Sequence, residues 1–99
     1  MADVQEGLVS EGAPAHGRGV QRVYRFQNGY GASVIRTDFS YGGKEGLWEL
    51  AVVRWSDDSW SIVYDTPVTS DVLGRLSDAD VSEALAAIRV LPAPAEDAR

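Results

Sequence analysis

The sequence predicts an α+β domain, with an antiparallel sheet of about four strands in two hairpins and one C-terminal helix on one face. Two pairs of runs rich in β-branched and aromatic residues, each pair joined by a short turn, indicate the hairpins. One segment near the C-terminus has helical hydrophobic periodicity. We expect a single domain over residues 20–91, after a loosely attached arm over residues 1–19 and before a tail over residues 92–99. Within the arm, DVQEGLV (residues 3–9) is compatible with a short edge strand.

The first hairpin is predicted around Asn28-Gly29, between the runs VQRVYRF and YGASVIR. Both central residues of a two-residue type I′ turn take positive φ, which Asn and Gly tolerate best. A two-residue loop fixes the register so that Phe26 faces Gly31. An aromatic ring across from a glycine covers its bare backbone. Gly31 therefore has a structural explanation that requires no ligand, and Asn28-Gly29 is interpreted as a turn only.

The second hairpin is predicted from LWELAVVRW and WSIVY, joined at residues 56–59. This register places Trp55 opposite Trp60 and Val53 opposite Ile62, an apolar row that we expect to face the helix. The other face is expected to be apolar enough to bury against a second chain, which predicts a homo-oligomer. Its apolar residues would be Val23, Ala32, Val34, Val52 and Val63.

The C-terminal helix is marked at its start by Ser77 and Asp80, which fit a capping box. Arg89 suits the last turn, and Pro92 stops the helix. The helical stripe consists of Val81, Ala84, Leu85, Ile88 and Leu91. The preceding segment DTPVTSDVLGRL (residues 65–76) predicts a turn followed by a short helical turn.

Composition excludes several kinds of chemistry. The chain has no cysteine, so it has no thiolate metal site and no disulfide. His16 is the only histidine and lies in a glycine-rich arm, where it would be poorly positioned as a base. The carboxylate pair Asp57-Asp58 is explained as an exposed turn. We expect no enzyme activity, no metal and no cofactor, and the longest apolar runs are too short for a membrane span.

The glycine-rich loop from Phe39 to Gly46 is too long for a tight hairpin turn. It lies in a basic stretch, residues 18–54, of a chain whose net charge is −6. Two interpretations stay open: the loop packs its aromatics on the sheet edge, or its backbone N–H groups and cations accept an anion. The overall charge argues against a nucleic-acid polymer. In the second interpretation the ligand-binding residues would be Tyr30, Arg36, Phe39, Tyr41, Gly42, Gly43, Lys44, Asp65 and Thr66.

Four segments resemble a family of short, mostly unassigned proteins encoded by tailed bacteriophages. They are FQNGYGASVI, FSYGGKEGLWELAVV, YDTPVTSDVLGRL and DVSEALAAI, and the resemblance covers residues 20–91. It implies a phage protein in the host bacterial cytoplasm, and it carries over no catalytic residue. By analogy it favours a non-enzymatic accessory protein that counters host defence by sequestering a nucleotide-type small molecule. The alternatives are a protein–protein inhibitor of a host factor, acting through the acidic C-terminal half, and a minor structural phage protein.

Overall fold

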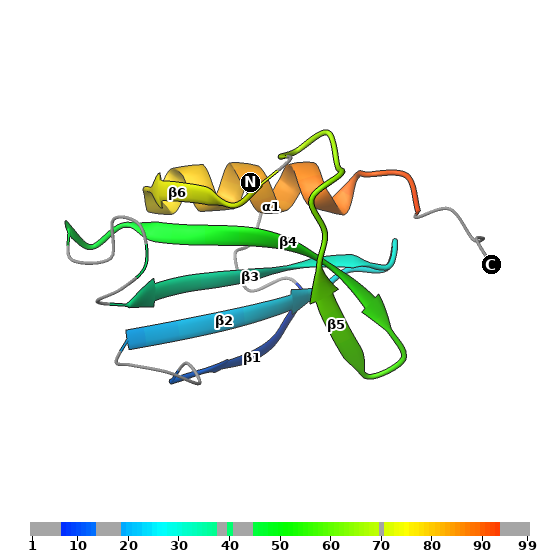
Figure 1. Ribbon diagram of the computed structural model, residues 1–99, viewed down its shortest axis with the longest axis horizontal. Helices are drawn as coiled ribbons and strands as arrows, with labels where there is room; N and C mark the ends of the chain where they lie inside the picture. Colours follow the sequence, from blue (N-terminus) through cyan, green and yellow to red (C-terminus); the bar gives the residue numbers. More distant parts are fainter. Residues whose placement is uncertain (1–6, 14–18, 38–39, 41–44, 70, 94–99) are drawn as a thin grey trace.

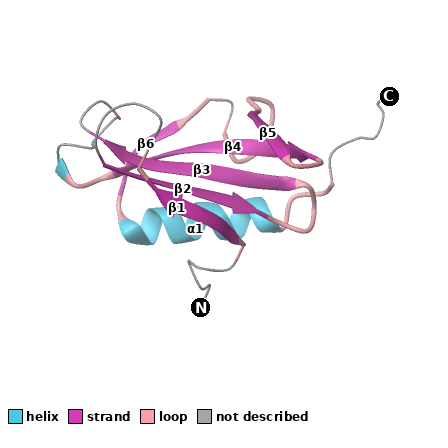
Figure 2. Cartoon of the chain, turned by 90° about the horizontal axis from the view of Figure 1, so that it is seen from below, coloured by secondary structure: helices cyan, strands magenta, loops and turns pink. Residues whose placement is uncertain are grey.

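The protein is a six-stranded antiparallel sheet with one helix on one side, as Figure 1 and Figure 2 show. This computed structural model describes residues 7–13, 19–37, 40, 45–69 and 71–93. The elements are β1 (Leu8–Gly12), β2 (Gly19–Arg25), β3 (Tyr30–Thr37), β4 (Trp48–Ser56), β5 (Ser59–Ile62), β6 (Leu73–Leu76) and α1 (Asp78–Arg89). The predicted α+β class and the C-terminal helix are confirmed, but the predicted number of strands, about four, is too low.

The two additional strands come from segments with weak local signals. β1 arises from the N-terminal arm and pairs with β2 at the edge of the sheet. β6 occupies part of the segment predicted to contain a short helical turn, and that prediction is wrong. Leu73 and Leu76 pair with Leu50 and Trp48 of β4, beside the part of β4 that β5 does not cover. The open edge of β4 supplies backbone partners, and this tertiary context overrides local propensity.

The first hairpin has a register one residue away from the predicted one. Arg25, not Phe26, pairs with Gly31, and the Phe26 N–H donates to the Tyr30 carbonyl at 2.8 Å. The loop is therefore the three residues 27–29, with Gly29 at φ 92°. Among the described non-glycine residues, only Asp57 and Arg75 have positive φ, so the predicted type I′ turn is also wrong. Three-residue hairpin loops of this kind end in a left-handed glycine.

Trp55 takes the covering role that was predicted for Phe26. Its Nε1–H donates to the Tyr24 carbonyl at 2.9 Å. A Cβ atom added to Gly31 would lie 2.8 Å from that indole nitrogen and would collide with the same carbonyl. Gly31 is therefore required because the Trp55 indole and the Tyr24 backbone approach it too closely for a side chain. This role is structural and needs no ligand.

The second hairpin has the predicted pairing but the opposite orientation. Trp55 pairs with Trp60, and Val53 pairs with Ile62. The helix-facing row of β4 is, however, the alternate one that begins at Trp48. Both rows of this strand are apolar, so a period of two could not decide which row faces the helix.

The core lies between this face of the sheet and α1. The helix contributes Val81, Leu85 and Ile88 to it. The buried sheet residues of the core are Tyr24, Phe26, Ala32, Val34, Trp48, Leu50 and Val52. Ala32, Val34 and Val52 were expected on the second face, so that expectation is corrected. The predicted capping box is confirmed, because Ser77 Oγ accepts from Asp80 N and the Asp80 carboxylate accepts from Ser77 N.

Candidate functional site

Two arginines and a tryptophan cluster at the end of the sheet where α1 begins. Arg36 lies near the end of β3, one residue beyond the Ile35–Glu49 pair that joins β3 to β4. Trp48 begins β4, and Arg22 lies on β2. The guanidinium carbon of Arg36 is 4.3 Å from the Trp48 ring centroid, and that of Arg22 is 4.7 Å from it. Both distances are within the range of cation–π attraction. The same indole ring therefore contacts two positive groups.

Trp48 is fixed in this position by the first turn of α1. Its side chain is 2% exposed, and its Nε1–H donates to Asp78 Oδ1 at 2.8 Å. Asp78 is the first residue of the helix, where a carboxylate also interacts favourably with the helix dipole. The capping box of Ser77 and Asp80 fixes the first turn of α1, and this turn carries Asp78. The residues from Ser77 to Asp80 therefore start the helix and hold the Trp48 side chain.

Each guanidinium keeps donors for a further acceptor. The Arg22 Nε–H donates to Glu11 Oε2 at 3.0 Å, across the β1–β2 pair. An Nη1–H of Arg36 donates to the Gly46 carbonyl at 3.3 Å. Among the described residues, each of these contacts uses one of the five N–H groups that an arginine carries. The remaining N–H groups suit a planar anionic acceptor such as phosphate or carboxylate.

A cavity of about 310 Å³ lies beside the cluster. It is lined by Arg22, Arg36, Trp48, Asp78 and Val81. Its volume is at the lower end of the range for pockets that bind small molecules, roughly 300–1,000 Å³. Asp78 contributes a carboxylate to the same lining, and Glu11 pairs with Arg22 beside it. Such a site matches a ligand that has one anionic group for the arginines and N–H or O–H donors for Asp78.

The Tyr24 hydroxyl is a buried polar group close to Arg22. Tyr24 has 0% exposure, and its hydroxyl has no hydrogen-bond partner among the described residues. Burial raises the pKa of Tyr24 above its ordinary value of 10.0, and the nearby Arg22 guanidinium offsets part of that rise. Buried hydroxyls normally have a partner. The core therefore retains an unused donor next to the arginine cluster.

The residues predicted to form the site are distributed over different parts of the fold. Arg36 belongs to the cluster described above. Tyr30 is at the other end of β3, six residues and therefore roughly 20 Å away along the strand. Asp65 is exposed, whereas Thr66 is buried and its Oγ1 contacts the backbone of Thr69 at 3.3–3.4 Å. The structure brings neither Tyr30 nor these two residues together with Arg36.

The remaining predicted site residues lie outside the described residues. They are Phe39, Tyr41, Gly42, Gly43 and Lys44. The ends of their segment are described. Thr37 and Ser40 exchange hydrogen bonds through their hydroxyls and backbone, and Glu45 pairs with Arg75 at 2.8 Å. Both ends lie at the same end of the sheet as Arg36, because they connect the end of β3 to the start of β4.

Arg22, Trp48 and Asp78 were not predicted as site residues. Arg22 had a weak signal in the sequence. It lies two residues before the core residue Tyr24 on the same strand, so both side chains point to the covered face of the sheet. The contact of Trp48 with Arg36 depends on how β3 and β4 are aligned across the loop between them. That alignment is known only from the strand register in the structure. Contact of Asp78 with Trp48 depends on the position of the helix, which no local pattern specifies.

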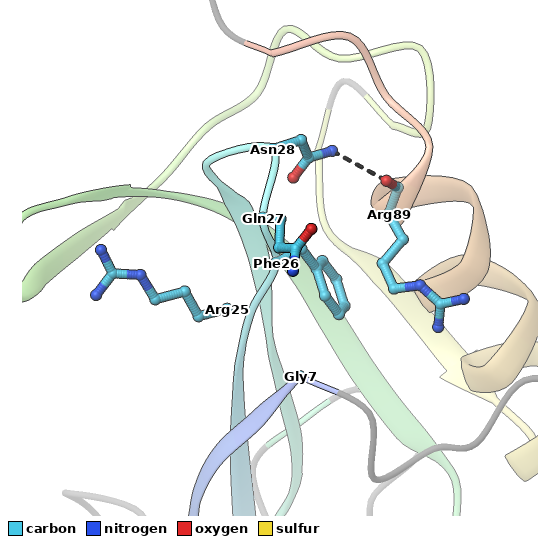
Figure 3. Close-up of a pocket in the computed structure, with 6 residues that line it drawn as sticks. All are labelled: Gly7, Arg25, Phe26, Gln27, Asn28 and Arg89. Atoms are coloured by element: carbon cyan, nitrogen blue, oxygen red, sulfur yellow. Dashed lines mark hydrogen bonds between the residues drawn. The ribbon is translucent and has the colours of Figure 1, made fainter.

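A second cavity, of about 350 Å³, lies at the other end of α1 and is explained by the fold. Figure 3 shows Asn28 reaching the last turn of the helix, and Arg25 pointing away from Arg89. The Asn28 Nδ2 atom donates to the carbonyls of Ile88, at 2.9 Å, and Leu91, at 3.0 Å, and lies 3.3 Å from that of Arg89. The Asn28 amide thus caps the C-terminal end of the helix, and its N–H donors are already engaged there.

Comparison of the chain with protein-family models, with curated proteins and with solved structures finds no match. Within the described ranges, no group of three or more acidic or histidine side chains is placed to hold a metal ion. The same part of the chain contains no helix that is long and apolar enough to cross a membrane. The function proposed below therefore depends on the geometry of the arginine cluster.

Proposed function

We propose that this protein binds a small anionic ligand of nucleotide type, without catalysis, at the cavity beside Arg22, Arg36 and Asp78. The observation that carries this proposal is the convergence of two guanidiniums on one buried indole next to a cavity of about 310 Å³. Two arginines held on an aromatic surface have lost part of their rotamer freedom before any ligand arrives. Preorganisation of this kind lowers the entropic cost of binding.

The contacts indicate how a nucleotide would be held. Trp48 is nearly inaccessible, so the ligand meets the outer sides of the guanidiniums and not the indole. The phosphate accepts hydrogen bonds from Arg22 and Arg36, and a charge-assisted contact of this kind contributes roughly 1.5–3 kcal/mol. Asp78 accepts from an N–H of the base or from a ribose hydroxyl. In the phage setting that the sequence resemblance implies, such binding would sequester a nucleotide signal of the host.

Calorimetric titration tests this function. The panel contains inorganic phosphate, linear 5′-nucleotides and cyclic nucleotides. We expect saturable binding of at least one nucleotide to the wild type, and a loss of about ten- to a hundredfold in affinity for Arg36→Ala, from the energy of one charge-assisted contact. Arg25→Ala removes a guanidinium that lies 4.7 Å from the Trp55 ring centroid and does not line this cavity, and it serves as the matched control.

Arg36→Lys separates charge from geometry, because lysine keeps the positive charge but loses the planar fork and the stacking surface. We expect this variant to bind weakly, closer to Arg36→Ala than to the wild type. Thermal midpoints of all variants are recorded in parallel, since Arg36 also contacts Trp48 and Gly46. Absence of binding by the wild type to the whole panel, or equal affinities for wild type and Arg36→Ala, would contradict the proposal.

A further inference from the structure

A third cavity, of about 310 Å³, forms an apolar groove between β6 and the outer side of α1. Leu73 and Leu76 of β6 and Ala84 of α1 contribute to its lining and remain half-buried, although all three also pack against the core. Ala87 continues the groove one turn along the helix. Val90, a further three residues on, is 79% exposed, the most exposed large apolar side chain among the described residues. An apolar strip of this length on a small domain is typical of an interaction surface.

The charges that border the groove all have one sign. Asp80 and Glu83 line it, and no cation does so among the residues that the structure describes. The nearest basic residue of β6, Arg75, is engaged with Glu45 at 2.8 Å. Glu83 is exposed and accepts no hydrogen bond in the described structure, so its carboxylate is available to a partner. The groove therefore complements an apolar segment that carries lysine or arginine.

This chemistry disfavours the two ends of the chain, and a second copy that docks rim to rim, as occupants. Residues 1–6 contain Asp3 and Glu6 without a cation, and residues 94–99 contain Glu96 and Asp97 against a single Arg99. A second copy of the chain would bring a second acidic rim to the first. Like charges brought together in this way disfavour such contacts. The acidic rim therefore favours a different molecule, of basic character.

The groove also favours a helix over an extended peptide. An added strand needs a regular edge, whereas β6 is only four residues long, has an irregular register against β4, and is interrupted by Arg75 at φ 56°. On the helix side, the lining residues Asp80, Glu83, Ala84 and Ala87 recur at helical spacing and form one straight side of α1. Two helices can pack side by side over such a face, with small residues allowing close approach.

We infer that the groove between β6 and α1 is a docking site for a basic amphipathic helix of a partner protein. The partner places apolar side chains over Leu73, Leu76 and Ala87, and its lysines or arginines meet Asp80 and Glu83. This is the helix-in-groove mode of recognition. It lies apart from the arginine cluster and does not depend on the proposed nucleotide function.

Fluorescence anisotropy with three labelled model peptides tests the inference. One peptide has leucine and lysine at helical spacing, one has leucine and glutamate, and one has lysine and glutamine without leucine. We expect the full-length protein to bind the first peptide and neither of the others. Binding should weaken as salt is added, because the rim contacts are exposed charges.

Two variants localise the binding. Glu83→Lys reverses a rim charge, and Ala87→Arg fills the groove with a cation; both positions are exposed, so the fold should be retained. We expect each to weaken binding of the leucine–lysine peptide about tenfold or more. Asp58→Lys makes the same charge change on the β4–β5 turn and should leave the affinity unchanged. The inference is overturned if the wild type does not bind this peptide, if the leucine-free peptide binds equally well, or if both groove variants bind as the wild type does.

Discussion

Asn28 is expected to stabilise the protein as the C-cap of α1, a role that can be separated from its place in a turn. The last carbonyls of a helix have no partner within the helix. The Asn28 Nδ2 atom donates to the Ile88 carbonyl in the last turn at 2.9 Å and to the Leu91 carbonyl just after the helix at 3.0 Å, and Oδ1 accepts from Tyr30 N at 3.0 Å. Three hydrogen bonds at about 0.5–1.5 kcal/mol each give a loss of roughly 1.5–4.5 kcal/mol for Asn28→Ala.

Asn28→Asp distinguishes the two roles. Aspartate suits turns as well as asparagine does, and it keeps the acceptor for Tyr30 N. It lacks the amide donors, however, and places a carboxylate against the negative end of α1. We therefore expect Asn28→Asp to destabilise the protein at least as much as Asn28→Ala. The penalty should shrink as the pH falls below about 4, where the introduced carboxyl becomes protonated and can donate.

Urea and thermal unfolding followed by circular dichroism measure the effect. For a domain of this size, a loss of 2–3 kcal/mol lowers the thermal midpoint by on the order of 10 °C or more. Gln27→Ala, an exposed neighbour in the same loop, is the control and should unfold like the wild type. Wild-type stability of Asn28→Asp at neutral pH would show that the residue acts as a turn residue only.

Three further outcomes are expected from the same unfolding assays. Gly31→Ala should cost at least about 2 kcal/mol, because its Cβ would collide with buried backbone, whereas Gly12→Ala, with nothing within 4 Å, should be nearly neutral; equal stabilities would contradict this. Ser77→Ala should cost about 1 kcal/mol through loss of the capping hydrogen bond, and a change near zero would show that the cap is dispensable. Tyr24→Phe should be nearly neutral at pH 7, since the hydroxyl it removes has no partner; a loss above about 1 kcal/mol would reveal one. Because the folded-state pKa of Tyr24 is raised, its contribution to stability is full below about pH 10 and is lost as the pH rises further, and Tyr24→Phe should remove that loss.

The elements that the sequence predicts well are those with strong local signals. The helix and its capping box follow from periodicity and from two polar residues at its start. The second hairpin follows from a short polar turn between two apolar runs. The first hairpin differs by one residue, because Asn28 is used as a helix cap and so does not adopt the positive φ of a type I′ turn. That cap joins residues 60 positions apart, which no local pattern contains.

The faces of the sheet were not predictable for a related reason. In β4 both rows are apolar, so burial against the helix is decided by where α1 lies and not by the strand itself. Of the candidate site, Arg36 was identified from its charge beside a glycine-rich loop. Its partners come from three other elements, and they meet through strand register and helix position.

The most direct measurement for the ligand site is a nitrogen–proton NMR titration of the labelled protein with the nucleotide panel. The chain contains three tryptophans, and each indole N–H gives a separate signal. The Trp48 indole lies against Arg22 and Arg36, whereas those of Trp55 and Trp60 belong to the β4–β5 hairpin and act as internal references. We predict that a binding nucleotide shifts the Trp48 indole and the Nε–H signals of the two arginines while the hairpin indoles stay in place. Shifts confined to Trp55 and Trp60, or a spectrum unchanged by every nucleotide, would contradict the proposed site.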